Sequence, residues 1–313
     1  MQKQYAPYIR TSDSTSGIMM DVCIALIPAA VFGVYVYGIC ALLVIILSVC
    51  SCVASEMLWQ LLMHREVTVS DGSAAVTGLL LALTLPPKTE WWIPVSGGTF
   101  AIIIVKQLYG GLGKNIMNPA LAARCFLLIS FARQMTEYRL PFVDAVSGAT
   151  PLAAAGMGEN IDIVRLFAGL VPGCIGEVSV PALLIGAVYL IYKKVITLLI
   201  PVTYITSFLM YIVLYSLLNG ICINMGQIGV QLFGGGLILA AFFMLTDYVT
   251  SPMSPAGRII YSVAAGILTG VLRCQGSSAE GVSFAILCAN MLVPLIDKIG
   301  NYLESTIPVR KEI

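Results

Sequence analysis

Long apolar runs, separated by short polar breaks, follow one another along almost the whole chain. A helix needs about 20 mainly apolar residues to cross the hydrocarbon core of a membrane, and several runs approach this length. The longer runs cover residues 20–38, 39–62, 92–108, 178–192, 195–218, 228–245, 259–272 and 282–299. Each run is predicted to form a helix, because a helix satisfies its backbone hydrogen bonds within one segment, as the membrane interior requires.

Two further runs, 73–85 and 118–131, are shorter and are bounded by glycine or proline. Short segments of this kind are typical of broken or re-entrant helices that are buried among other helices. The pattern therefore predicts an all-α integral membrane protein with about ten transmembrane helices, some of them broken or re-entrant.

A polar stretch divides the apolar runs into two groups. The predicted parts are a single membrane domain, 1–313, made of a first helical half, 1–132, a loop, 133–162, and a second helical half, 163–313. A weak similarity between Gln107 to Gly111 and Gln231 to Gly235 suggests that the halves are related, although glycine-rich apolar sequences also match by chance. Paired membrane halves often form a site at their interface.

Composition narrows the possible functions. With 58% hydrophobic and 11% charged residues, the chain has too little polar surface for a soluble globule, so a lipid bilayer is its expected surroundings. The net charge of +1 gives no basis for binding nucleic acid, and the single histidine excludes a histidine-rich haem or zinc site. The nine cysteines are not clustered like iron–sulfur ligands. We interpret them as small hydrophobic residues. The alternative is that Cys40, Cys125 or Cys174 meets a cysteine of a partner subunit.

The distribution of Lys and Arg predicts the orientation. If the amino terminus is cytoplasmic and every run crosses the membrane, most of these residues fall on the cytoplasmic side, as the positive-inside rule favours. This orientation puts the loop at 133–162 on the extracytoplasmic side, and the chain is expected in the cell's inner (cytoplasmic) membrane. No cleavable signal sequence is expected between Met1 and Asp21.

The loop carries the motif Asp-x-x-Ser-Gly-Ala-Thr, whose fixed residues are Asp144, Ser147, Gly148, Ala149 and Thr150. This motif resembles the site at which a flavin transferase joins FMN to a threonine through a phosphodiester bond. Thr150 would supply the nucleophilic oxygen, and the small residues before it would let an enzyme approach the backbone. The alternative is an ordinary exposed turn that Pro151 ends.

A wider resemblance extends over nearly the whole chain. The blocks that carry it lie at residues 71–78, 110–120, 246–252 and 280–285. Together with the threonine motif they resemble the D subunits of Rnf complexes, and they are similar to the B subunits of sodium-pumping NADH:quinone reductases. The quinone-reductase subunits are longer ahead of their first helix, so the 313 residues of this chain favour the Rnf interpretation.

The resemblance implies a relay subunit in a complex that couples electron transfer between reduced ferredoxin and NAD to sodium or proton movement. It implies FMN on Thr150 and a second, non-covalent flavin, riboflavin, deeper in the membrane. The implied partners are the A, B, C, E and G subunits and the flavin transferase, and no complete active site is expected on this chain alone. Two alternatives stay open, the quinone-reductase subunit itself and a solute channel, because the family fold resembles that of urea channels.

Two asparagines near the second block are candidates for contact with the second flavin. Asn115 and Asn118 are three residues apart and share a face if the segment is helical. Each amide both donates and accepts hydrogen bonds, as an isoalloxazine edge requires, and the resemblance places the second flavin nearby. The alternative is that they cap a helix beginning at Pro119.

Two ionisable residues complete the candidates. Asp247 ends an apolar run and precedes Thr250, an oxygen-rich arrangement that suits a hard cation and predicts part of an ion pathway. Otherwise it caps a helix end or pairs with Arg258. Arg124 would stabilise a reduced, anionic flavin, because a nearby positive charge favours the anion. Otherwise it pairs with Glu56 inside the bundle.

Overall fold

The computed structural model describes residues 14–142, 148, 150–156, 161–177, 179–220, 224–275 and 281–306. In the first half the elements are α1 (Thr15–Tyr37), α2 (Ile39–Leu62), η1 (Val69–Asp71), α3 (Ser73–Leu83), α4 (Trp92–Thr99), η2 (Phe100–Gln107) and α5 (Pro119–Ser130). The loop contributes α6 (Ala132–Met135) and α7 (Pro151–Gly156). The second half holds α8 (Ile163–Ala168), α9 (Val180–Tyr192), α10 (Leu199–Asn219), α11 (Met225–Phe233), α12 (Leu237–Leu239), η3 (Ala240–Met244), α13 (Pro255–Gln275) and α14 (Gly281–Thr306). Every element of these ranges is a helix, which confirms the all-α prediction.

The helices differ in length, and only some cross a membrane unaided. Among the described residues, five helices are long and apolar enough to span, namely α1, α2, α10, α13 and α14. Three shorter apolar helices, α3, α5 and α9, lie among them, and the π-helix η2 continues α4. Each predicted apolar run except 228–245 corresponds to one of these helical units. The short units are tolerated because neighbouring helices, rather than lipid, surround their ends.

The run predicted as one helix over 228–245 is broken. The axes of α11 and the following α12–η3 segment differ by 54°, because Gly235 and Gly236 adopt φ angles of 63° and 65°, a left-handed conformation that favours glycine. Arg273 of α13 donates hydrogen bonds to the carbonyls of Gly234 and Gly235 at 2.9 and 3.0 Å and to that of Gln231. The guanidinium therefore satisfies the carbonyls that the break leaves without helical partners.

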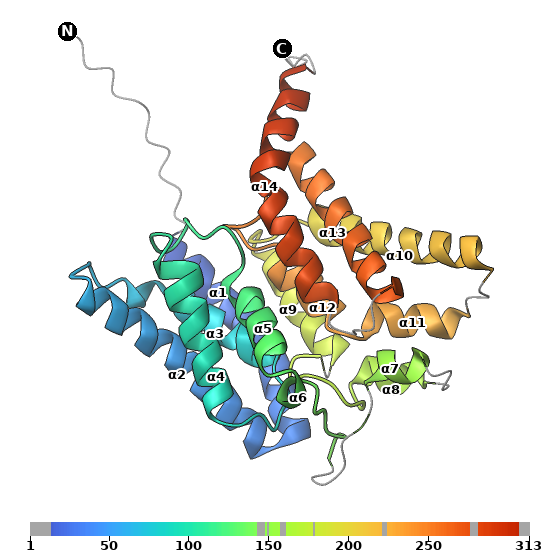
Figure 1. Ribbon diagram of the computed structural model, residues 1–313, viewed down its shortest axis with the longest axis horizontal. Helices are drawn as coiled ribbons and strands as arrows, with labels where there is room; N and C mark the ends of the chain where they lie inside the picture. The colour runs from blue at the N-terminus through green and yellow to red at the C-terminus, as the bar shows by residue number, and fades with distance from the viewer. Residues whose placement is uncertain are drawn as a thin grey trace.

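Two helix pairs join the halves of the chain. Helix α1 packs against α9, and α5 packs against α14, while α10, α13 and α14 form the opposite side of the bundle (Figure 1). The crossing of α1 and α9 is close, because a Cβ added to Gly186 would clash with the carbonyl oxygen of Ala25. Small residues allow such an approach between membrane helices.

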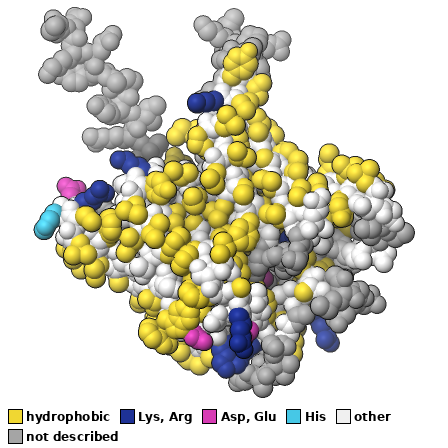
Figure 2. Space-filling model, in the orientation of Figure 1, with side chains coloured by type: hydrophobic (Ala, Val, Ile, Leu, Met, Phe, Trp, Pro, Cys, Tyr) yellow, Lys and Arg dark blue, Asp and Glu magenta, His cyan; other side chains and the backbone are white. Residues whose placement is uncertain are grey.

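The surface matches a membrane setting. In Figure 2 hydrophobic side chains cover most of the visible face, whereas charged side chains lie mainly toward its upper left and lower edges. Helix α1 has 23 residues and is therefore about 34 Å long, comparable with the membrane's hydrocarbon thickness. The short helices α6, α7 and α8 lie together near the bottom of Figure 1, at the end of the bundle where α1 meets α2.

Candidate functional site

Thr150 lies outside the long helices, directly before α7. Its side chain is half-buried, its hydroxyl oxygen accepts a hydrogen bond from the Ala153 N–H at 3.3 Å, and its carbonyl accepts one from the Ala154 N–H at 2.9 Å. These bonds are those of a helix N-cap. Of the other motif residues, Gly148 donates its N–H to the Tyr138 carbonyl at 3.0 Å, and Asp144, Ser147 and Ala149 lie outside the described residues.

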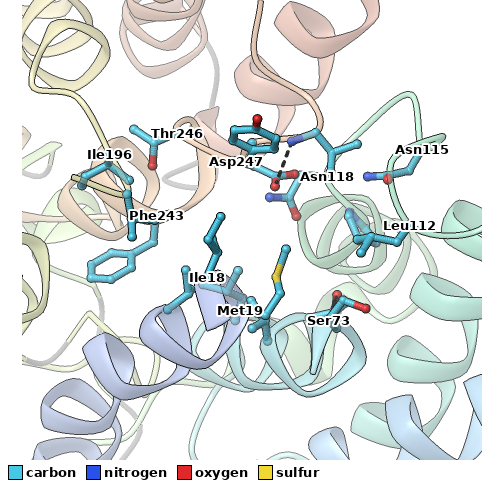
Figure 3. Close-up of a pocket in the computed structure, with 18 of the residues that line it drawn as sticks. Ile18, Met19, Ser73, Leu112, Asn115, Asn118, Ile196, Phe243, Thr246 and Asp247 are labelled. Carbon is cyan, nitrogen blue, oxygen red and sulfur yellow. Dashed lines mark hydrogen bonds between the residues drawn. The ribbon is translucent and has the colours of Figure 1, made fainter. Parts of the chain in front are cut away.

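A second candidate region is a small cavity at the amino end of α1, which we term the polar cavity (Figure 3). Its volume is about 80 Å³. Its polar lining consists of Ser73, Thr77, Lys106, Asn115, Asn118, Thr246 and Asp247. These side chains come from both halves of the chain, as expected for a site at the interface of paired membrane halves.

The two asparagines meet in this cavity, although not for the predicted reason. Residues 110–118 are not helical, so the expected shared helix face is wrong. Asn118 instead caps α5: its Oδ1 accepts hydrogen bonds from the N–H groups of Ala120 and Leu121 at 3.0 and 3.4 Å, which confirms the capping interpretation for Asn118 but not for Asn115. The same side chain lines the cavity and donates to the Met244 carbonyl at 3.4 Å, so it connects the two halves. Asn115 donates to the Met117 carbonyl at 3.2 Å.

Asp247 follows η3 and faces the cavity from the second half (Figure 3). Its carboxylate accepts hydrogen bonds from the Thr250 hydroxyl at 3.1 Å and the Val249 N–H at 3.5 Å. Burial raises the pKa of Asp247 above its ordinary value, and these two bonds partly oppose the shift. The alternative ion pair with Arg258 is wrong, because Arg258 donates to the Pro252 carbonyl at 3.1 Å and no bridge to Asp247 occurs among the described residues.

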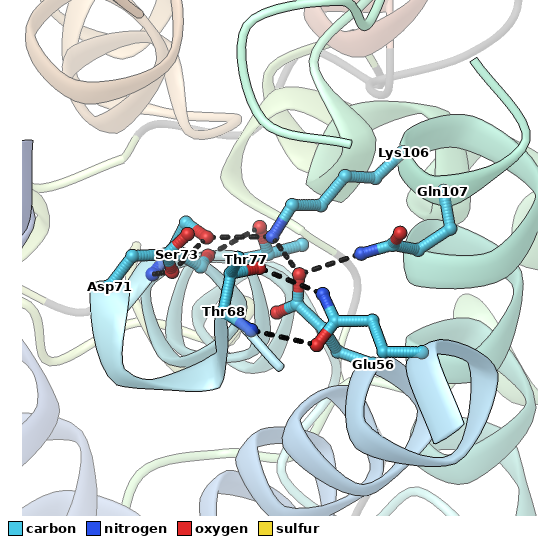
Figure 4. A network of polar contacts seen from close by, with 8 residues as sticks. Glu56, Thr68, Asp71, Ser73, Thr77, Lys106 and Gln107 are labelled. Carbon is cyan, nitrogen blue, oxygen red and sulfur yellow. Dashed lines mark hydrogen bonds and ion pairs between the residues drawn. The ribbon is translucent and has the colours of Figure 1, made fainter. Parts of the chain in front are cut away.

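A buried ion pair borders the same cavity and was not anticipated (Figure 4). Lys106 Nζ lies 2.7 Å from Glu56 Oε1 and 2.6 Å from Ser73 Oγ, and Gln107 donates to the same Glu56 oxygen at 2.7 Å. Only 1% of Glu56 and 2% of Lys106 is exposed, and the second carboxylate oxygen of Glu56 has no hydrogen-bond partner in the part of the chain described. The sequence signal for this pair was the presence of one acidic residue, Glu56, and one basic residue, Lys106, inside two separate apolar runs.

Arg124 lies elsewhere in the core. Its Nη2 is 3.7 Å from Glu177 Oε1 and 3.6 Å from Cys174 Sγ. The expected alternative pair of Arg124 with Glu56 is therefore wrong, and Arg124 does not line the polar cavity. Its predicted role toward a flavin stays a prediction. The thiols of Cys125 and Cys174 are buried within this chain and that of Cys40 is partly exposed, so pairing with a partner's cysteine stays a prediction best suited to Cys40.

Together these features define a multi-pass α-helical membrane protein with a polar interface between its halves. The family model described as NQR2, RnfD, RnfE matches residues 2–302, and the chain belongs to this family. It is 46% identical to the D subunit of the Na(+)-translocating ferredoxin:NAD(+) oxidoreductase complex of Acetobacterium woodii, over 94% of this chain and 91% of that relative.

Two other relatives have the same extent. The D subunit of the proton-translocating ferredoxin:NAD(+) oxidoreductase complex of Clostridium ljungdahlii is 40% identical, over 94% of this chain and 92% of the relative. The D subunit of the ion-translocating oxidoreductase complex of Stutzerimonas stutzeri is 38% identical, over 91% and 90%. The similarity thus covers the helices, the loop and the polar cavity alike.

Proposed function

We propose that this chain is the D-type subunit of an ion-translocating ferredoxin:NAD oxidoreductase in the cytoplasmic membrane, and that it relays electrons through FMN joined to Thr150. Two electrons from reduced ferredoxin and one proton convert NAD⁺ to NADH, and this chain would carry electrons between subunits. Membership of the family and the names of its relatives support the proposal. The partners would be the A, B, C, E and G subunits.

The observation that carries the flavin part is the position of Thr150. Its hydroxyl is half-buried rather than enclosed and belongs to a loop outside the spanning helices, where a transferase has access. In the attachment step the hydroxyl oxygen attacks the flavin-side phosphorus of a flavin adenine dinucleotide. The bond between the two phosphates breaks, AMP leaves, and the hydroxyl proton passes to a base of the transferase. A bound flavin then supplies one- and two-electron transfer.

The polar cavity is proposed as part of the ion pathway. A hard cation prefers carboxylate, amide and hydroxyl oxygens, which Asp247, Asn115 and Thr246 offer around one small volume. At about 80 Å³, the cavity is well below the range of about 300 to 1,000 Å³ typical of small-molecule pockets. It therefore suits water and ions better than an isoalloxazine ring. The second flavin stays a prediction.

The relatives named above favour ferredoxin and NAD over the quinone-reductase alternative, and they include both a sodium- and a proton-translocating complex. One assay distinguishes the proposed function from the quinone-reductase alternative. Membranes that contain this chain and its partner subunits should reduce NAD with reduced ferredoxin, whereas a quinone reductase would oxidise NADH with quinone. A solute channel would do neither and would purify without bound flavin.

The flavin proposal is tested by mass spectrometry of the chain co-expressed with its transferase. We expect the peptide containing Thr150 to carry one FMN, and the Thr150→Val variant to lose it completely while still assembling in the membrane. Thr136→Val is the matched control, because Thr136 is an exposed threonine of the same loop whose hydroxyl donates to the carbonyls of Ala132 and Arg133 in α6. An unmodified Thr150 peptide in native material would refute covalent attachment.

A further inference from the structure

A second pocket lies at the carboxyl end of α1, opposite the polar cavity, and we term it the cationic pocket. Its volume is about 260 Å³. Its lining includes Tyr35, Tyr37, Lys88, Arg139, Leu140 and Phe142. Two cations and three aromatic rings therefore surround one opening, a combination that none of the functions considered so far uses.

The cationic pocket is within reach of Thr150. Gly148 donates its N–H to the carbonyl of Tyr138 at 3.0 Å, and a Cβ added to Gly148 would lie 3.5 Å from the Leu140 side chain, which lines the pocket. Thr150 is two residues farther along the chain, so its Cα lies at most about 7 Å from that of Gly148. A ribityl phosphate attached to its hydroxyl is long enough to bring a ring into the pocket.

The walls match a planar, electron-accepting ring. Tyr35 and Phe142 meet edge to face with centroids 5.7 Å apart, and both side chains are exposed at the opening. Phe142 has a φ of 60°, an uncommon conformation for a bulky residue, and its N–H donates to the Val36 carbonyl at 3.4 Å. This backbone conformation places the Phe142 ring beside Tyr35 in the lining of the pocket.

We propose that the cationic pocket seats the isoalloxazine ring of the flavin on Thr150, with Lys88 and Arg139 stabilising its reduced form. The inference rests on the proposed function. Two-electron reduction adds two electrons and one proton and leaves one negative charge on the ring, and nearby cations favour that anion. The volume is just below the range of about 300 to 1,000 Å³ for small-molecule pockets, which is adequate because the ribityl phosphate stays outside.

The first test is a redox titration of the covalent flavin in the purified complex, with dithionite as reductant. Lys88→Gln should reduce the equilibrium constant for two-electron reduction about tenfold, which lowers the midpoint potential by about 30 mV. Arg65→Gln is the control, because it removes an exposed charge beyond the far end of α2. Equal potentials for the two variants would overturn the proposal.

The second test uses fluorescence, since an aromatic ring in contact with a flavin quenches its emission. Tyr35→Leu should raise the emission of the covalent flavin several-fold, whereas Tyr192→Leu, an exposed position at the end of α9, should leave it unchanged. The mass of the Thr150 peptide is measured in every variant. If native Thr150 carries no flavin, the proposed function and the seat both fail. If it carries flavin but either variant matches its control, only the seat fails.

Discussion

The polar cavity and the cationic pocket lie at opposite ends of one helix and differ in almost every property. Met19 of α1 lines the first and Tyr35 lines the second, a separation of about 24 Å along the helix axis. The polar cavity is small, is lined by residues of both halves, and presents a carboxylate, two amides and the Lys106 ammonium group among mostly apolar side chains. The cationic pocket is larger and presents two cations and aromatic rings at the surface, beside the loop that carries Thr150.

The difference between the two ends fits the two proposed roles, ion movement at the polar cavity and flavin binding at the cationic pocket. A small volume reached by a few carboxylate, amide and hydroxyl oxygens selects by size and charge, whereas a planar cofactor needs a larger opening with aromatic walls. If each end has the proposed role, electron transfer and ion movement are coupled through the helix bundle and not by direct contact. Substitutions at one end should then leave the chemistry at the other end intact.

The largest effect is expected from the buried ion pair beside the polar cavity. Lys106→Met leaves the Glu56 carboxylate buried without its cation and should destabilise the protein by about 3 to 5 kcal/mol, measured by thermal unfolding in detergent. Adding Glu56→Gln should recover most of the loss. Arg133→Met, which breaks the exposed pair with Glu137, should cost no more than about 1 kcal/mol. Equal losses for the buried and exposed pairs would contradict this reasoning. Flavin attachment should be unaffected.

A smaller effect on the free energy of unfolding is expected from the close crossing of α1 and α9. Gly186→Ala would place a methyl group against the Ala25 carbonyl oxygen, inside van der Waals contact, so α1 and α9 must separate, at a cost of about 1 to 3 kcal/mol. Gly226→Ala is the control, because a Cβ there meets no atom within 4 Å. The same unfolding assay compares them, and a stable Gly186→Ala variant would show that the crossing is looser than described.

The smallest effect on free energy is expected from Asp247. Asp247→Asn should weaken apparent ion affinity about tenfold, or about 1.4 kcal/mol, with flavin content unchanged, as measured by ion uptake into vesicles that contain the complex. Burial raises the pKa of Asp247, so this carboxylate takes up a proton at a higher pH than an ordinary aspartate does. Ion uptake by the native protein should therefore begin to decline at that higher pH as the solution is acidified. The Asn variant should lack this decline. Asp162→Asn, in the loop before α8, should behave as native, and identical uptake in all three proteins would remove Asp247 from the pathway.

Much of the fold followed from local signals. Apolar run length identified every long helix, and Pro119 after Asn118 marked the start of α5. The polar, proline-ended motif placed Thr150 outside the helices. The bend between Phe233 and Leu237 escaped prediction, because glycines in an apolar run are equally compatible with close helix packing.

By itself, then, the sequence determined which segments form apolar helices and which form polar loops, since both follow from the local order of apolar and polar residues. Only the tertiary structure decided that Glu56 pairs with Lys106 rather than with Arg124, and that Asn118 meets the second half at Met244. Those partners are 50 and 126 residues apart. Their choice depends on which helices pack side by side, a property of three-dimensional packing that residue periodicity along one helix does not record.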